Sequence, residues 1–476
     1  MRMLTGTKWG ASKKSLLKIY RSLIRSILDY GSVAYDSAAQ THKTKLDSIQ
    51  YRALMICTGA IRGTAASALQ NECGEMPLSI RRNKQQIQFA IKIKATQNHQ
   101  SEKVLKDHWT HHHGKYNKGG ESFRNKVKDF FQNNTLSLDP ITPQIDPPWT
   151  VQQVNTNTSL SNIITKQDPP HIIKAHATEL IHKHGQSLAI YTDGSKSKQG
   201  QVSSAFCIPE LGIAESSRLT DNLTVYTAEL VAIRQSLTWI IAYDASVVVK
   251  PNHAGLASDR DIVIYSDSLS SIQSIENNKS DTRPNLVSSI IKQISSITNR
   301  HITVCWIPSH VGIQGNESAD ILAKTALDRP NIDIALPFEY RETYEIVDKY
   351  AIKKWQVLWD NSKTGHFYRQ IFPKISLKIK YENTIRDKEI KLTRLRIGKC
   401  RLNKYLHTIK CHPTGLCDSC GVEETVDHYL LDCEESNIKN RIKEICTKEN
   451  IPLKIVDVLR HDLILDAIYH LINRDL

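Results

Sequence analysis

The spacing of apolar residues changes along this chain of 476 residues. Between residues 186 and 330, short apolar runs such as LAIYTD, VSSAFCIP and IVIYSD alternate with segments in which apolar residues recur every three to four positions. Short runs rich in β-branched and aromatic residues predict strands, and the recurring spacing predicts amphipathic helices. Strands that alternate with helices in this way predict an α/β domain built on a mixed sheet.

Outside that region, the apolar residues follow helical spacing alone. Leu16, Leu23 and Ile27 lie on one stripe of the first segment, with lysines and arginines between them. Proline, glycine and polar residues interrupt the segment that follows, which predicts a long linker with one or two short helices. We therefore predict a helical segment, a linker, the α/β domain, a basic helical region, a cysteine–histidine segment and a C-terminal helix. In that order they cover residues 1–107, 108–185, 186–330, 331–410, 411–440 and 441–476.

The positive charge is concentrated outside the predicted α/β domain. The chain carries 63 lysines and arginines against 49 acidic residues, a net charge of +14. Residues 186–330 hold 12 basic and 14 acidic residues, so the flanking segments carry the whole positive excess. Basic arms around a slightly acidic core are typical of an enzyme domain that is held on a polyanion such as nucleic acid. A positive surface that only keeps the protein soluble is the alternative interpretation.

The sequence predicts neither a membrane span nor a secretion signal. It contains no run of about 18 apolar residues, and the N-terminal stretch MRMLTGTKWGASKK lacks the apolar segment of a signal peptide. Ten cysteines without such a signal favour a reducing compartment, where clustered cysteines bind metal more often than they form disulfides. We expect an intracellular protein, in the nucleus or the cytoplasm, that is not secreted and does not enter a membrane.

Four acidic residues of the predicted α/β domain lie at the ends of strands or near the starts of helices. Asp193 and Asp267 each follow a strand, whereas Glu229 and Asp320 each lie near the start of a helix. Adjacent parallel strands would bring the two aspartates to one edge of the sheet, where the helix starts would add the other two acids. Four converging carboxylates repel one another, and divalent, oxygen-seeking ions such as Mg²⁺ relieve that repulsion. Taken singly, each acid also fits a turn cap or a place near a helix N-terminus.

Sequence blocks in this region resemble the type 1 ribonuclease H domains of non-LTR retrotransposons. YTDGS, YTAEL, YSDS and WIPSHVGIQGNESADILAK occur in the order of that family's blocks. The resemblance implies a five-stranded mixed sheet flanked by helices. It also implies that two Mg²⁺ or Mn²⁺ ions support cleavage of the RNA strand of RNA–DNA hybrids, leaving 5′-phosphates. The family's catalytic, metal-binding acids correspond to Asp193, Glu229, Asp267 and Asp320. Its loop histidine corresponds to His310, which can transfer a proton near neutral pH.

Two other functions stay open at this point. One is a nucleic-acid-binding protein whose nuclease is silent, although the four acids and His310 are all present. The other is a different nuclease or a transposase on the same fold, although such proteins lack the TDGS and TAEL blocks. The stretch NNKSDTRPN has no room for the extra basic helix with which some relatives hold the hybrid. The basic flanks could take over that task.

The N-terminal segment has a resemblance of its own. LLKIYRSLIRSILDYGSVAY, LDSIQYRALMICTGAIRGT and ECGEMPLSIRR resemble the region that follows the reverse transcriptase palm in the same retrotransposons. The chain contains no Asp-Asp dipeptide, the pair that such a polymerase needs, so we expect no polymerase activity. The resemblance implies the C-terminal part of an element's polyprotein, either truncated or encoded as a separate gene.

A cysteine–histidine cluster follows in the segment CDSCGVEETVDHYLLDC. Cys417, Cys420, His428 and Cys433 supply three thiolates and an imidazole, which can close a tetrahedral structural zinc site. The spacing is wider than in the retroviral knuckle and resembles the C-terminal motif of the same retrotransposons. Four side chains without a metal are the alternative. Other candidate ligands lie nearby in the sequence: Cys400, His407, Cys411 and His412.

The stretch before this cluster is strongly basic. Residues 374–410 hold 12 lysines and arginines against 3 acids, and bases alternate with apolar residues in KLTRLRIGKCRLNKYLHTIK. Beside a zinc knuckle, such a stretch predicts a nucleic-acid clamp, although a basic face that only contacts solvent has the same pattern. The predicted nucleic-acid-binding residues are Lys391, Arg394, Arg396, Lys399, Arg401 and Lys404.

Overall fold

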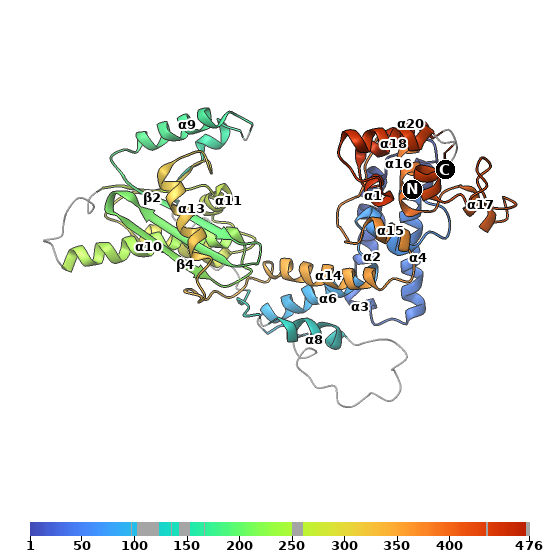
Figure 1. The fold of residues 1–476 in the computed structure, drawn as a ribbon. Coiled ribbons are helices and arrows are strands. Elements are labelled where there is room, and N and C mark those ends of the chain that lie inside the picture. The colour runs from blue at the N-terminus through green and yellow to red at the C-terminus, as the bar shows by residue number, and fades with distance from the viewer. Residues whose placement is uncertain are drawn as a thin grey trace. The chain divides into compact units, whose positions relative to one another are not determined.

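The chain forms two compact units (Figure 1). The sheet unit comprises residues 91–102 and 135–346, and the helical unit comprises residues 1–90, 103–134 and 347–476. The computed structural model describes residues 1–96, 98–101, 123–134, 136–141, 153–165, 167–249, 260–434 and 437–472, with the backbone alone at 124, 126 and 245–249.

The sheet unit is built on a six-stranded mixed sheet. The strand order is β1-β6-β5-β2-β3-β4, in which β1, β6, β5 and β2 run parallel and β3 and β4 are antiparallel neighbours. The strands are β1 (Asn155–Asn157), β2 (Leu188–Lys196), β3 (Val202–Ile208), β4 (Ile213–Leu219), β5 (Ile262–Ser266) and β6 (Ile302–Trp306). The helices are η4 (Ser159–Asn162), α9 (Pro170–Lys183), η5 (Pro209–Leu211), α10 (Val225–Val249), α11 (Leu269–Glu276), α12 (Pro284–Ser296) and α13 (Gln314–Ala326). Strands β2 to β6 are the five that the sequence predicts.

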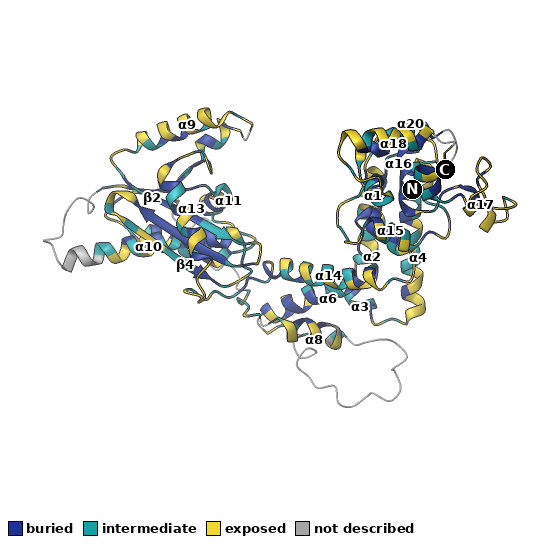
Figure 2. Cartoon of the chain, in the orientation of Figure 1, coloured by how far each residue is buried: buried dark blue, intermediate teal, exposed yellow. Residues whose placement is uncertain are grey.

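Helices cover both faces of the sheet, and alternate strand residues enter different cores. In β5, Ile262 and Ile264 pack with α10, α11 and α12, whereas Val263 and Tyr265 pack with α9 and α13. Because both faces are covered, most residues of β2, β3, β5 and β6 are buried, whereas β1 and most of β4 are more exposed (Figure 2). This burial explains why the four buried strands are mainly apolar runs.

The prediction that residues 108–185 form a linker with one or two short helices misses that β1 and α9 pack into the sheet unit. Strand β1 pairs with β6 and adds a sixth strand to the expected five. Leu160, Ala177 and Leu180 are buried in the same core as Tyr265. The pattern conceals these elements because β1 has only three polar residues and α9 buries a narrow stripe between exposed lysines and histidines. Parts of the predicted linker, among them 108–122 and 142–152, lie outside the described residues.

The helical unit combines segments from both ends of the chain. Trp359, Tyr368 and Ile397 share one apolar core with Leu16 and Leu54. Among the described residues, no helix has the length and apolar character that crossing a bilayer requires. The first helices are η1 (Arg2–Leu4), α1 (Lys13–Ile19), η2 (Tyr20–Arg25), α2 (Ser26–Asp29), α3 (Ser32–Tyr35), α4 (Gln40–Thr58), α5 (Ala66–Cys73), α6 (Leu78–Ala95) and α8 (Phe123–Asn133). The later ones are α14 (Thr343–Asp360), α15 (His366–Ile371), α16 (Arg386–Ile397), α17 (Asn403–Thr408), η7 (His428–Asp432), α18 (Asn437–Lys448), α19 (Ile455–Val458) and α20 (Asp462–Leu471).

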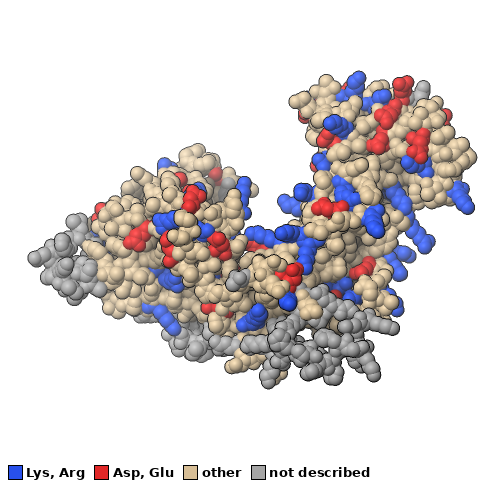
Figure 3. Space-filling model, turned by 60° about the horizontal axis from the view of Figure 1, so that its bottom comes forward, with Lys and Arg blue, Asp and Glu red and all other residues tan. Residues whose placement is uncertain are grey.

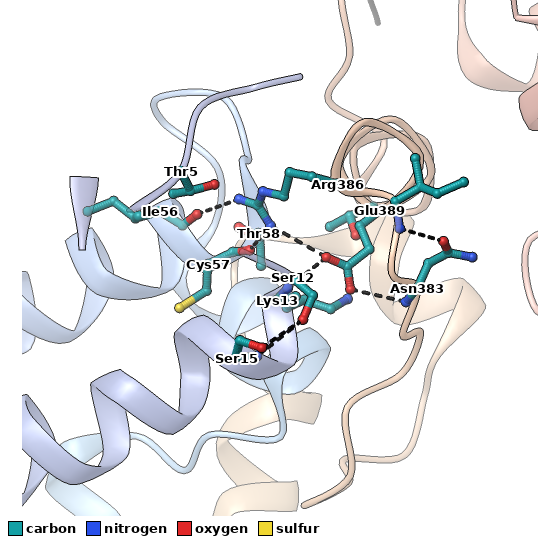
Figure 4. Close-up of polar contacts among 12 residues, drawn as sticks. Thr5, Ser12, Lys13, Ser15, Ile56, Cys57, Thr58, Asn383, Arg386 and Glu389 are labelled. Carbon is teal, nitrogen blue, oxygen red and sulfur yellow. Dashed lines mark hydrogen bonds and ion pairs between the residues drawn. The ribbon is translucent and has the colours of Figure 1, made fainter. Parts of the chain in front are cut away.

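Buried polar contacts join the two ends of the chain within the helical unit (Figure 4). The Arg386 guanidinium donates to the carbonyl oxygens of Ile56 and Cys57 at 2.7 and 2.6 Å, where α4 ends. The Glu389 carboxylate accepts from the backbone amide of Lys13 at 2.7 Å, at the start of α1. The N-terminal helices therefore depend on α16, although the sequence suggests separate segments.

Candidate functional site

The register of two parallel strands brings Asp193 and Asp267 together. Thr192 in β2 pairs with Ser266 in β5, and each aspartate is the next residue. The Trp306 indole donates to the carbonyl oxygen of Asp267 at 3.0 Å and holds the end of β5. The predicted neighbourhood of the two strands is thus confirmed. The prediction that Asp193 ends its strand is wrong, because β2 pairs with β3 as far as Lys196.

Glu229 reaches the same edge from the second turn of α10. The Thr224 hydroxyl caps that helix by accepting from the Thr227 amide at 3.2 Å. The helix lies so close to β2 that a Cβ on Gly194 would stand 2.5 Å from the Glu229 nitrogen. Glycine at position 194 is therefore what lets α10 place Glu229 beside Asp193.

Asp193, Glu229 and Asp267 form a cluster whose carboxylate oxygens lie within 4.8 Å of one another. Burial, and then the Asp267 and Asp320 carboxylates, raise the pKa of Asp193 to about 7. Burial and the neighbouring Asp193 carboxylate also raise the pKa of Glu229, and burial raises that of Asp267. Glu229 Oε2 is buried without a hydrogen-bond partner in the described part of the chain. A buried, mutually repelling group of oxygen donors fits a hard divalent cation.

Asp320 and His310 lie at the more open side of this cluster. Asp320 is the fourth predicted acid. Its charge helps to raise the pKa of Asp193, but its carboxylate is not among the three that lie within 4.8 Å of one another. The Lys324 ammonium lies 2.7 Å from Asp320 Oδ2, one helical turn along α13. His310 Nδ1 lies 4.0 Å from the same oxygen, and its side chain is 68% exposed. His310 has a φ of 53°, which few residues other than glycine adopt, so the loop holds a specific conformation.

The sequence reasoning missed three residues of this site. Asn316 is buried in α13, and its side-chain amide donates to Asp267 Oδ2 at 3.5 Å. Lys324 places a positive charge on Asp320, and Gly194 sets the distance between α10 and β2. The i,i+4 spacing of Asp320 and Lys324 could have predicted their ion pair from the sequence. Nothing in the sequence except the glycine itself indicated the close approach of α10 at Gly194.

The cysteine–histidine cluster converges in the helical unit. Ligand atoms of Cys417, Cys420, His428 and Cys433 lie within 4.8 Å of one another. The Cys417 amide donates to the Val422 carbonyl at 2.7 Å, which closes a tight turn around the first two cysteines. His428 is the first residue of η7, and Cys433 directly follows that helix. The four residues chosen from the sequence are therefore brought together as one group.

The surroundings of Cys417 favour its thiolate form. Burial acts to raise the pKa of this thiol, but hydrogen bonds from the Cys420 and Ser419 amides and from His428 outweigh it and lower the pKa to about 6. Because Zn²⁺ binds thiolate sulfur, this environment and the donor set fit a structural zinc ion. None of the substitute ligands considered from the sequence belongs to the group formed by the described residues.

For one of the six predicted nucleic-acid-binding residues, Arg396, the prediction is wrong. Arg396 is 1% exposed and forms an ion pair with Glu72, which also contacts Lys13 Nζ at 2.7 Å and the Tyr368 hydroxyl at 2.8 Å. Burial acts to raise the pKa of Glu72, but Arg396 and Lys13 outweigh it and lower that pKa. The prediction failed because α16 carries basic residues on every side, including the one that packs inward.

The other five basic residues differ in how accessible they are. Lys391 pairs with Asp387 at 3.0 Å, and Arg394 donates to the Gly59 carbonyl at 2.8 Å. Lys399 is partly buried, whereas Arg401 and Lys404 are exposed. On the face that Figure 3 shows, lysine and arginine side chains are dispersed among acidic ones. The exposed end of the basic stretch, rather than α16 itself, is therefore the part that can contact a polyanion.

Comparison with known families places the acidic cluster in context. Residues 185–328 match a family model described as RNase H. The mixed sheet flanked by helices agrees with that fold, so the predicted fold class is confirmed and the sheet unit contains an RNase H domain. A search of curated proteins found no match to this chain.

Proposed function

We propose that this chain is a divalent-metal-dependent endonuclease that cuts the RNA strand of RNA–DNA hybrids. The single observation that carries the proposal is the buried cluster of Asp193, Glu229 and Asp267 inside an RNase H domain. RNase H domains act on RNA–DNA hybrids in general, and the three acids occupy one sheet edge beside an exposed histidine.

The residues at this sheet edge would have different roles in the reaction. Asp193, Glu229 and Asp267 would hold two Mg²⁺ or Mn²⁺ ions, with Asp320 completing the acidic set. When bound, such ions activate a water molecule and stabilise the leaving oxygen of a phosphodiester. Asn316 orients Asp267 through its amide. His310 is exposed and near Asp320, so it can accept or release a proton at the solvent side of the site.

The helical unit would bind and position nucleic acid. Cys417, Cys420, His428 and Cys433 would hold a structural Zn²⁺ that fixes the turn following the basic stretch. Arg401 and Lys404 are exposed just before this turn and can contact phosphates. The resemblances at both ends of the chain support an origin in a non-LTR retrotransposon, without polymerase activity.

A substrate panel tests the proposed reaction. The full chain is incubated with labelled RNA–DNA hybrid, duplex DNA and single-stranded RNA, with and without added Mg²⁺. We expect cleavage of the hybrid only, dependent on Mg²⁺ and absent from Asp193→Asn. Cleavage of duplex DNA would instead indicate another nuclease on this fold. Tight hybrid binding without any cleavage would make the chain a catalytically silent binding protein.

A further inference from the structure

A carboxylate from beyond the matched region contacts the helix that carries Glu229. The chain leaves the RNase H match at residue 328 but stays in the sheet unit: Ile334 bridges to Leu219, and Phe338 bridges to Leu138. The segment then turns at residues 339–342 and places Glu342 against the start of α10. The prediction that a basic helical region begins at 331 is therefore wrong for residues 331–342.

Glu342 is held by a dense set of contacts. Its Oε1 accepts from the Thr224 hydroxyl at 3.0 Å, from the Thr224 amide at 3.4 Å and from the Thr227 hydroxyl. Its Oε2 forms an ion pair with Arg283 and accepts from the Glu339 amide at 3.2 Å. Arg283 Nε donates in turn to the Thr227 hydroxyl at 3.2 Å. Both charged side chains are buried, that of Glu342 completely.

These contacts determine the position of the first turn of α10. A carboxylate at a helix N-terminus is favoured by the helix dipole, and here it also binds both hydroxyl groups of the capping turn. Arg283 is the residue just before α12, so Glu342 ties the starts of two helices together. Losing the carboxylate would leave the buried Arg283 with only the more distant Asp139 carboxylate, 3.9 Å away, and would release the capping hydroxyls from Glu342.

The tied turn lies directly before the metal-binding candidate. Glu229 is two residues after Thr227 on the same helix, and its backbone nitrogen passes Gly194 too closely for any larger residue. A small shift of the helix start would change the distance from the Glu229 carboxylate to Asp193 and Asp267. Partners that orient metal ligands commonly affect metal affinity by about 10- to 100-fold.

We propose that Glu342 is a positioning residue of the acidic site: it fixes the start of α10 so that Glu229 can bind a divalent cation. This inference rests on the proposed function, because it assumes that the acidic cluster binds such cations. It assigns a role in the site to a segment outside the region that matches the family.

The test compares Glu342→Ala and Glu342→Gln with the wild-type full chain. Asp244→Asn is a matched control, because Asp244 lies on α10 too and pairs there with the buried Arg300. Binding of Mn²⁺ is measured from the electron paramagnetic resonance signal of the free ion, and hybrid cleavage is measured over a range of Mg²⁺ concentrations. Melting temperatures are recorded for every variant.

We expect Glu342→Ala to weaken Mn²⁺ binding and to raise the half-saturating Mg²⁺ concentration by about tenfold or more, with KM for the hybrid within about twofold. Glu342→Gln keeps an acceptor oxygen, so its Mn²⁺ affinity should lie between those of the wild type and Glu342→Ala. Asp244→Asn should lower the melting temperature without changing Mn²⁺ binding. Unchanged Mn²⁺ binding in Glu342→Ala would overturn the inference. So would faster cleavage with a lower KM, which would show that Glu342 obstructs the substrate.

The metal-binding measurement separates this inference from the proposed function. Wild-type protein that binds Mn²⁺ but does not cut the hybrid would refute the proposed function alone. If Glu342→Ala then lost Mn²⁺ binding, the positioning role would stand. Wild-type protein that binds no Mn²⁺ would refute both.

Discussion

Replacing Asp193 by asparagine should stabilise the metal-free protein in a way that depends on pH. Burial and the neighbouring acids raise the pKa of Asp193 from 3.8 to about 7 in the folded chain. Because the folded pKa lies above the unfolded one, the folded state binds more protons between these values. Wild-type stability should therefore fall as pH rises from about 4 to about 7. Asparagine carries no charge and should not show this loss.

The size of the stability difference between the wild type and Asp193→Asn follows from the pKa shift of Asp193. A difference of roughly 3 pKa units corresponds to roughly 4 kcal/mol at pH 8, because each unit contributes about 1.36 kcal/mol. Asp193 is buried, so solvent reduces this value little. For a domain of 150–250 residues, 1 kcal/mol shifts the melting temperature by about 2–4 °C, which gives roughly 10 °C for the sheet unit.

Thermal unfolding of the full chain in buffer free of Mg²⁺ and Mn²⁺ measures this effect. We expect Asp193→Asn to melt well above the wild type at pH 8 and close to it at pH 4.5. Added Mg²⁺ should stabilise the wild type and narrow the difference. Glu215→Gln removes an exposed carboxylate from β4 and should change neither curve. An equal difference at both pH values would refute the assignment of a raised pKa to Asp193.

Four further predictions concern other residues of the chain. Gly194→Ala should lower hybrid cleavage by roughly 10²-fold, because the added Cβ displaces Glu229; wild-type rates would contradict the packing argument. Cys420→Ser should reduce the zinc content, measured by mass spectrometry, from one ion per chain to none; an equal content in both proteins would exclude this site. Arg396→Met should destabilise the helical unit by about 3 kcal/mol in urea unfolding, because the buried Glu72 loses one of its two cationic partners and keeps only Lys13. Arg401→Ala should leave stability unchanged and lower by about 1 the slope of the logarithm of hybrid affinity against the logarithm of salt concentration. Loss of stability in Arg401→Ala, or a lower salt slope in Arg396→Met with unchanged stability, would refute the assignment of Arg401 to the surface and of Arg396 to the core.

The core of the acidic site was predictable because strand order and residue type determine it. Apolar runs ending near Asp193 and Asp267 indicated buried strands, and parallel neighbours must present their carboxyl ends at one edge. Glu229 was recognisable as an acid near the start of a predicted helix. The cysteines and His428 were recognisable because metal ligands of this type recur at short spacings.

The remaining features depend on contacts that leave no local pattern. Strand β1 is too short and polar to be recognised before it pairs with β6. Arg396 resembles its basic neighbours in sequence, and only its burial against Glu72 distinguishes it from a surface residue. Glu342 is one acid among many until the chain folds back onto α10, more than a hundred residues earlier.

The most direct test of the central claim is to follow both strands of one hybrid during incubation with the full chain. The hybrid carries one label on its RNA strand and a different label on its DNA strand, and cleavage is timed with and without Mg²⁺. The account predicts that only the RNA strand is shortened, only with Mg²⁺, with 5′-phosphate and 3′-hydroxyl ends, and not by Asp193→Asn. Cleavage of the DNA strand, or equal cleavage of RNA by wild type and Asp193→Asn, would contradict it.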